Sequence, residues 1–273
     1  MLMTMRPFPV LLGLAALCLA LPATTQAQGT TGVTTFDPAK FPGYVVDEVV
    51  VPVPSEIFSV LDKLGEPNWH QELRGVKMPE MTDRVSLSFV FGTVVAEGFV
   101  AVQARDRKAV EDIGREVIDL SQSLSIKKAV LNHAQAILDA ADKNQWADIR
   151  KQFDSTQKTV RETMDKQKDT ELSQCVSLGG WLRGTATVTS IVGKNYSADR
   201  AELLYQPDLV KHFRSQTGKM LSGKKKHPLI KAVDAGLKEI QEIMEKSSEG
   251  FKVESVTRIG VISNDLLKQI TNR

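Results

Sequence analysis

The stretch ELSQCVSLGGWLRGTATVTSIV, residues 171–192, decides how the rest of the chain is interpreted. It mixes apolar with small residues, and in a helix Gly180 and Gly184 fall one turn apart on the same face. Because a glycine costs about 1 kcal/mol relative to alanine inside a helix, we expect close approach of a neighbouring helix as the compensation. Arg183 lies within this motif, which argues against a lipid-facing helix. The stretch therefore predicts a buried helix around which other helices pack.

A second apolar segment, residues 85–104, permits two interpretations. Its start, VSLSFVF, alternates as a strand does, and Glu97 with the following glycine would form a hairpin turn. Its apolar residues also share one helical stripe and no strong turn signal interrupts them, so we predict a buried helix. The segment is long enough to cross a membrane, but Glu97 near its centre favours a protein core. Pairing of Glu97 with Arg183 would satisfy two lone charges, and this is our sharpest structural prediction.

The first 27 residues have the features of a secretory signal peptide. Arg6 supplies the positive charge, residues 9–21 form the apolar run, and residues 25–27 (TQA) fit the cleavage rule. Cleavage near Ala27 would place the mature protein in the periplasm or outside the cell. Residues 28–43 are small and polar, and they would form a flexible linker.

Helical periodicity dominates the rest of the chain. Residues 144–170 carry a narrow apolar seam typical of a coiled coil, with charges on the other faces. Residues 215–227 (SQTGKMLSGKKKH) predict a basic loop, and Pro228 begins a clearly amphipathic helix. Prolines before residue 55 forbid a regular helix there, so Val49–Val53 would form an extended strap.

The predicted fold class is therefore all-α: a multi-helix bundle with an extended N-terminal strap. Residues 44–198 would form the core of the bundle. Residues 199–273 would add C-terminal helices, which either pack on the bundle or form a separate module appended to it.

Recognised chemistry is scarce in this sequence. The four histidines show no metal-binding spacing, and no nucleophile elbow or phosphate-binding loop is present, so we predict no catalytic residue, metal or cofactor. After cleavage Cys175 is the single cysteine, which excludes an intrachain disulfide, and its helix interior suits a small core residue better than a nucleophile. The net charge of +2 and the aromatic content of 6% disfavour nucleic acid as a partner.

Three classes of function remain. The first is a non-enzymatic envelope protein that binds another envelope protein or itself, and is not integral to the membrane after cleavage. The alternative is a periplasmic carrier of a small apolar ligand or cofactor held between helices. The third, ranked last, is an enzyme with a polar core site. A partner-binding protein should expose an apolar patch, whereas a carrier should enclose a cavity lined by Phe89, Phe99 and Trp181. The candidate site residues are Glu97, Arg183, Trp181, Gly180 and Gly184.

Overall fold

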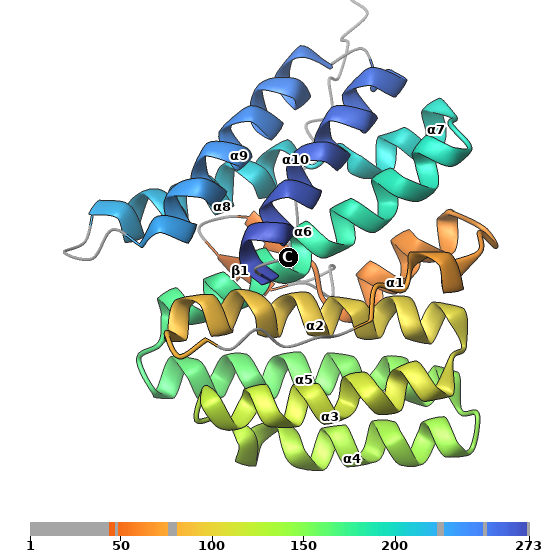
Figure 1. Cartoon of the computed structure of the whole chain (residues 1–273), viewed down its shortest axis with the longest axis vertical. Helices are drawn as coiled ribbons and strands as arrows, with labels where there is room; N and C mark the ends of the chain where they lie inside the picture. Colours follow the sequence, from red (N-terminus) through yellow and green to blue (C-terminus); the bar gives the residue numbers. More distant parts are fainter. Residues whose placement is uncertain (1–43, 47–48, 76–80, 223–226, 248–249, 272–273) are drawn as a thin grey trace, which may run out of the picture. The chain divides into compact units, whose positions relative to one another are not determined.

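The computed structural model describes residues 44–46, 49–75, 81–222, 227–247 and 250–271, all within one compact unit, Asp37–Arg273. This part of the chain is an all-α bundle, as predicted (Figure 1). The predicted signal peptide (residues 1–27) and linker (residues 28–43) lie outside the described residues.

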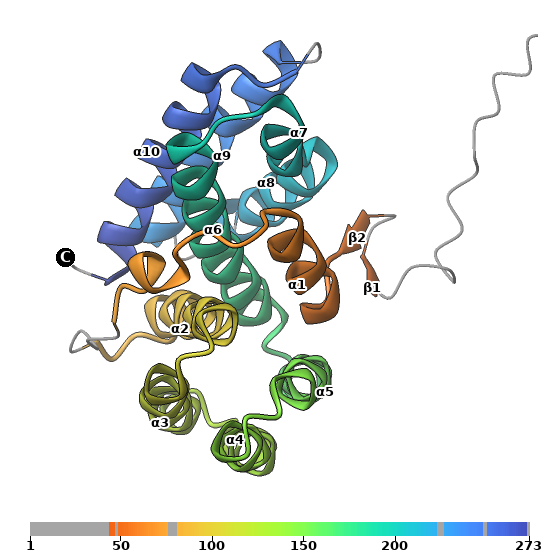
Figure 2. The ribbon, with the colours of Figure 1, turned by 90° about the vertical axis from the view of Figure 1, so that its right-hand side faces the viewer.

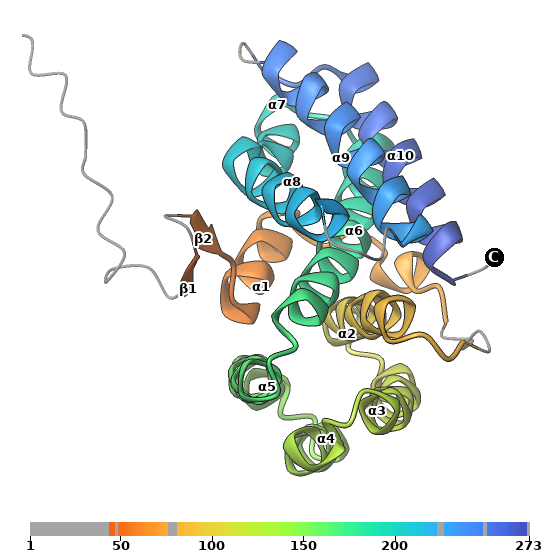
Figure 3. The same ribbon diagram turned by 90° about the vertical axis from the view of Figure 1, so that its left-hand side faces the viewer.

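Consecutive helices build a ring. Its members are α1 (Pro54–Lys63), α2 (Arg84–Ala104), α3 (Arg107–Ser123), α4 (Lys127–Asp142), α5 (Trp146–Lys166) and α6 (Thr170–Lys194). Seen end-on, α2 to α5 form an arc that α1 and α6 close (Figures 2 and 3). The helices α3, α4 and α5 are amphipathic, and their apolar faces point inward. The apolar seam predicted on residues 144–170 therefore packs within the same chain, against α4 and α1.

The segment predicted as either a helix or a hairpin is the helix α2. Asp83 caps it by accepting a hydrogen bond from the backbone N–H of Ser86 at 2.8 Å. Among the described helices, α2 alone is long and apolar enough to cross a membrane, and 83% of its apolar window is buried inside the protein. It packs most extensively against α6, which confirms that residues 171–192 form a central buried helix.

Two glycines allow α2 and α6 to touch backbone to backbone. A Cβ atom on Gly92 would lie 1.9 Å from the carbonyl oxygen of Val176, and one on Gly179 would lie 2.1 Å from that of Phe89. The sequence correctly predicted a close helix contact, and of the two glycines to which it assigned the contact, Gly180 takes part, since a Cβ atom there would lie 3.4 Å from the carbonyl oxygen of Gly92. At Gly184 a Cβ atom would meet nothing within 4 Å.

The four connections from α2 to α6 repeat one turn. Each has a non-glycine residue with left-handed backbone conformation: Arg105, Ser125, Asn144 and Lys168, with φ between 51° and 63°. The next residue donates its backbone N–H to a carbonyl five positions earlier, for example Asp169 to Met164 at 2.9 Å, which is the Schellman pattern. That residue is also the N-cap of the following helix, so each turn reverses the chain within a few residues.

The C-terminal part packs against α6. After the short turns α7 (Ala198–Ala201) and η3 (Glu202–Leu204) come α8 (Pro207–Ser222), α9 (Pro228–Lys246) and α10 (Val253–Thr271). Of these, α10 has the broadest contact with α6. The basic loop predicted to begin at Ser215 is wrong in its first part, because α8 continues through Gly218 and buries Thr217 and Met220.

The predicted N-terminal strap is a small hairpin where the structure describes it. Strand β1 (Tyr44–Val46) pairs with β2 (Val49–Val51) in antiparallel register, and β2 lies near α8. The extended backbone expected from the prolines is present, but its two strands pair with each other.

Candidate ligand-binding cavity

A cavity of about 490 Å³ lies inside the ring of helices. This is the size of a small-molecule site, for which about 300–1,000 Å³ is usual. Its wall is mainly apolar and takes residues from all six helices of the ring and from α8. Helices α2 to α5 contribute Val95, Phe99, Val110, Ile113, Val117, Val130, Ala134, Ile137, Phe153 and Val160.

Small residues on α6 create much of this space. Ser173, Ser177, Gly180 and Gly184 follow one another at steps of four, three and four residues, so they share a face of the helix, and all four line the cavity. They are half-buried although the helix is central, because the cavity borders them. The open space beside Gly184 means that this glycine costs helix stability without serving close packing.

Helix α1 closes the cavity between α2 and α5. Its Phe58 ring lies 4.7 Å from the ring of Phe99 on α2 and 5.8 Å from that of Phe153 on α5. Its neighbouring residues Ile57, Val60 and Leu61 line the cavity.

Asp62 fastens the end of α1 to both of these helices. It accepts two hydrogen bonds from Arg150 on α5, at 2.8 and 2.9 Å, and one from the side-chain amide of Gln103 on α2 at 3.0 Å. The hydrogen bonds from Arg150 hold the pKa of the Asp62 carboxyl below its usual value. We call these three side chains the latch.

Trp181 marks the place where the cavity passes from the ring towards α8. Its indole N–H donates to the side-chain oxygen of Gln206 at 2.9 Å, and its ring lies 5.7 Å from that of Phe213. All three residues line the cavity. Phe99 and Trp181 therefore occupy the wall as the carrier hypothesis expected, whereas Phe89 is wholly buried in the α2–α6 contact and is not part of the wall.

The predicted pairing of Glu97 with Arg183 is confirmed. Nε of Arg183 donates to Oε2 of Glu97 at 2.6 Å, with both side chains at most 5% exposed. Arg183 also donates to the hydroxyl of Thr187 and to the backbone carbonyl of Glu72, the last residue of the short helix η2 (Trp69–Glu72). The backbone N–H of Arg74 donates to the other oxygen of Glu97 at 2.5 Å. The pair thus ties the segment after η2 to α2 and α6.

The five candidate residues consequently divide into two groups. Trp181, Gly180 and Gly184 line the cavity, whereas Glu97 and Arg183 form a buried cluster that is not part of its wall.

Cys175 is a buried free cysteine. Burial raises the pKa of the Cys175 thiol to about 12, which keeps it protonated and unreactive at neutral pH. The described residues contain no group of three or more His, Cys, Asp or Glu side chains placed to hold a metal ion.

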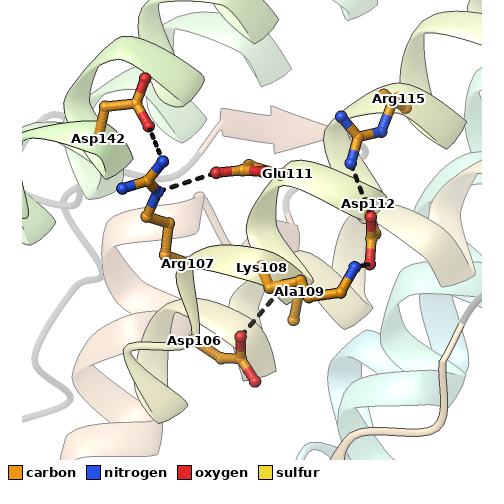
Figure 4. Close-up of polar contacts among 8 residues, drawn as sticks. All are labelled: Asp106, Arg107, Lys108, Ala109, Glu111, Asp112, Arg115 and Asp142. Atoms are coloured by element: carbon orange, nitrogen blue, oxygen red, sulfur yellow. Dashed lines mark hydrogen bonds and ion pairs between the residues drawn. The ribbon is translucent and has the colours of Figure 1, made fainter.

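The outer face of α3 is a solvent-exposed ion-pair network. Arg107 pairs with Glu111 at 2.9 Å and with Asp142 of α4 at 2.8 Å. Figure 4 draws these pairs and a second group, in which Asp112 pairs with Lys108 and Arg115; it also shows Asp106 accepting a hydrogen bond from the backbone N–H of Ala109. Its side chains carry both signs of charge, so this face presents no field that would select a ligand.

Sequence reasoning missed most of the wall. The apolar stripes of α3, α4 and α5 were visible in the sequence, but such a stripe is the same whether it faces a neighbouring side chain or an empty space. The small residues of α6 were the one available signal, which the sequence analysis interpreted first as helix packing and, under the carrier alternative, as room for a ligand.

Comparison of the chain with protein-family models, with curated proteins and with solved structures finds no match.

Proposed function

We propose that this protein is an exported, non-enzymatic carrier that holds a small apolar ligand in the cavity between its helices. The observation that carries the proposal is the cavity of about 490 Å³ with its mainly apolar wall. Closing apolar ligand surface off from water contributes about 25 cal/mol per Å², so a ligand enclosed there would gain affinity from desolvation without requiring many polar contacts.

The glycines of α6 support the same proposal. A stable protein without a ligand to hold would gain about 1 kcal/mol from alanine at Gly184, where a Cβ atom meets nothing. Retaining glycine there keeps the cavity open. Of the α6 glycines that line the cavity, the argument concerns Gly184 alone, because a Cβ atom on Gly180 would lie 3.4 Å from the carbonyl oxygen of Gly92.

Partner binding, the first hypothesis from the sequence, stays a prediction. The large apolar residues that are at least 40% exposed in the described chain are Leu131, Tyr196, Val253 and Val261. They lie on α4, in the segment after α6, and on α10, and their positions favour no particular partner.

Native mass spectrometry tests the proposal directly. The mature protein, purified from the envelope of its own host, should carry extra mass that is lost on denaturation. N-phenyl-1-naphthylamine, a neutral apolar fluorophore, should bind the ligand-free protein saturably at one molecule per chain.

Two matched variants locate the binding. Gly184→Phe projects a ring into the cavity and should weaken binding of the fluorophore. Gly193→Phe makes the same change on the same helix at an exposed position outside the wall, and should leave binding unchanged. A bare chain mass together with no saturable binding by the fluorophore would overturn the proposal, and so would equal effects of the two variants.

A further inference from the structure

The cavity wall contains a buried threonine whose hydroxyl the fold does not use. Thr185 on α6 is 8% exposed and lines the cavity. The other two buried threonines of this helix donate within it: the hydroxyl of Thr187 to the carbonyl of Arg183 at 3.0 Å, and that of Thr189 to the carbonyl four residues before it at 2.9 Å. The hydroxyl of Thr185 forms no hydrogen bond with any residue that the structure describes. Because burying a hydroxyl without a partner costs free energy, a partner is expected to come from inside the cavity.

A second set of hydrogen-bond donors belongs to Gln206, which lines the cavity just before α8. Its backbone carbonyl accepts from the N–H of Val210 at 3.1 Å, and its side-chain oxygen accepts from the indole N–H of Trp181 at 2.9 Å. An indole N–H can only donate, so the amide oxygen must face the indole and the amide nitrogen must face away from it. Within the described part of the chain, the two N–H groups of this nitrogen meet no acceptor.

These donors belong to the same part of the wall. Trp181 comes four residues before Thr185, so the two side chains lie one turn apart on the same face of α6. The hydrogen bond between Trp181 and Gln206 holds the amide beside this face. The ring of Trp181 lies 5.7 Å from that of Phe213, which also lines the cavity. Because these rings lower the local dielectric, a hydrogen bond made there is stronger than the same bond in water.

The chemistry of these groups selects a neutral acceptor. An amide nitrogen only donates, and a threonine hydroxyl can donate, so a ligand that satisfies both must present an oxygen that accepts. Neither side chain is charged, and burying a carboxylate against neutral donors would cost more free energy than burying a carbonyl. The charged residues of the wall, Glu56 and Arg161, belong to α1 and α5 rather than to α6 or the segment before α8.

We infer that the ligand is an apolar molecule with a neutral carbonyl group, as in a ketone, ester or amide, which accepts hydrogen bonds from the hydroxyl of Thr185 and the amide of Gln206. The apolar remainder of the ligand fills the space within the ring of helices. A few placed polar groups in a mainly apolar wall are the usual means by which a small-molecule site fixes the orientation of its ligand. This inference rests on the proposed carrier function and specifies the class of its ligand.

A matched pair of ligands tests the inference. 2-Acetylnaphthalene carries a carbonyl group, and 2-isopropenylnaphthalene has a methylene group in place of the carbonyl oxygen at nearly the same size. Each is titrated into the ligand-free protein in the presence of N-phenyl-1-naphthylamine, and the loss of fluorescence as the fluorophore is displaced gives its Kd. The ratio of the two Kd values is then compared between protein variants, because the difference in hydration between the two ligands is the same for every variant and cancels.

Three variants locate the carbonyl group. Thr185→Val removes the hydroxyl at nearly constant size and should lower the preference for the ketone about fivefold, the effect of losing one hydrogen bond between neutral groups. Gln206→Glu keeps an acceptor for Trp181 but replaces the amide nitrogen with an oxygen, and should lower the preference about fivefold or more. Thr156→Val is the matched control: Thr156 also lines the cavity, but its hydroxyl donates to the carbonyl of Gln152 at 2.6 Å, so the ratio should stay within about twofold.

The stability of Thr185→Val separates a role in ligand binding from a role in folding. This variant loses no hydrogen bond made within the described residues, so its midpoint of urea unfolding should not fall. The Kd of the fluorophore, which has no carbonyl group, should not rise in this variant either. A fall in the midpoint, or weaker binding of the fluorophore, would mean that the hydroxyl supports the fold and would refute the inference.

The possible outcomes separate the two proposals. If the fluorophore binds but Thr185→Val leaves the ratio unchanged, or if Thr156→Val lowers the ratio as much, the carbonyl site is refuted while the carrier function stands. 2-Naphthoic acid, which is charged at neutral pH, should bind more weakly than 2-acetylnaphthalene; tighter binding of the acid would also refute a neutral carbonyl. If neither the naphthalenes nor N-phenyl-1-naphthylamine binds, the carrier function itself is refuted, and this inference with it.

Discussion

The buried pair of Glu97 and Arg183 should be among the most sensitive points of the fold. Replacing Arg183 with methionine leaves the Glu97 carboxylate at 4% exposure without its cation. Replacing Glu97 with leucine leaves the guanidinium at 1% exposure with two neutral acceptors, the hydroxyl of Thr187 and the carbonyl of Glu72. Removing one partner of such a pair typically costs about 3–5 kcal/mol. For a protein of this size we expect the melting temperature to fall by about 6–20 °C.

The double variant should cost much less than the sum of the single ones. With both charges removed, no charge has to be desolvated when the protein folds. The remaining loss of stability comes from two backbone groups that lose their hydrogen-bond partner, the carbonyl of Glu72 and the N–H of Arg74. At about 1 kcal/mol each, the double variant should lose about 2 kcal/mol, against about 6–10 kcal/mol for the sum of the single losses.

Urea denaturation of the four proteins of this cycle measures the coupling. Arg107→Met is the matched surface control, because Arg107 pairs with two carboxylates in the exposed network of Figure 4 and should show no resolvable change. Raising the salt concentration should leave the coupling of Glu97 and Arg183 nearly unchanged, since the pair is shielded from solvent ions. If either single variant loses less than about 1 kcal/mol of unfolding free energy, or if the losses of the two single variants simply add in the double variant, the argument that this pair is desolvated and interdependent is refuted.

Four further predictions follow from the contacts. Gly179→Ala should destabilise the fold by about 1–3 kcal/mol, because its Cβ atom would lie 2.1 Å from a backbone oxygen, while Gly184→Ala should stabilise it by about 0.5–1 kcal/mol; urea unfolding compares the two. Ser125→Gly should stabilise the chain by about 0.5–1 kcal/mol by relieving a backbone at φ 63°, and a loss of stability would contradict this. Asp62→Ala should release the latch, so stopped-flow fluorescence with N-phenyl-1-naphthylamine should show faster association and faster dissociation at a nearly unchanged Kd, if the ligand enters where α1 closes the cavity; slower association would contradict entry at α1. Burial raises the pKa of the Cys175 thiol from 9.0 to about 12. The stability that this shift contributes is therefore complete below pH 9, and the free energy of unfolding falls by about 1.4 kcal/mol per pH unit as the pH rises towards 12. The Cys175→Ala variant should lack this part of the fall in a pH series of urea unfolding.

Two features of the fold were predictable because they depend on hydrophobic periodicity and on the cost of burying a charge. The helix at 85–104 follows from its apolar stripe, because Glu97 with the following glycine is only a weak turn signal for a hairpin. The partnership of Glu97 with Arg183 follows from electrostatics: each is a lone charge in an apolar helix, and the cost of burying a charge alone is high enough to require a partner.

The turns between the ring helices show where local rules fail. Arg105, Ser125, Asn144 and Lys168 take a left-handed conformation that glycine favours, yet none of them is a glycine. At each turn a backbone hydrogen bond five residues back stabilises this conformation, so the sequence marks the breaks without revealing that all four share one geometry.

The sequence by itself therefore determined the helices, their buried faces and the need for an ion pair in the core, because these depend on residue type and spacing along one chain. The tertiary structure decided which glycine meets a neighbouring backbone and which faces open space. Gly179 and Gly184 look alike in the sequence, but their surroundings depend on how closely α2 approaches α6 and on where the helices of the ring leave a cavity. A cavity is a property of the distances between helices, and those distances are set only when all the helices have packed.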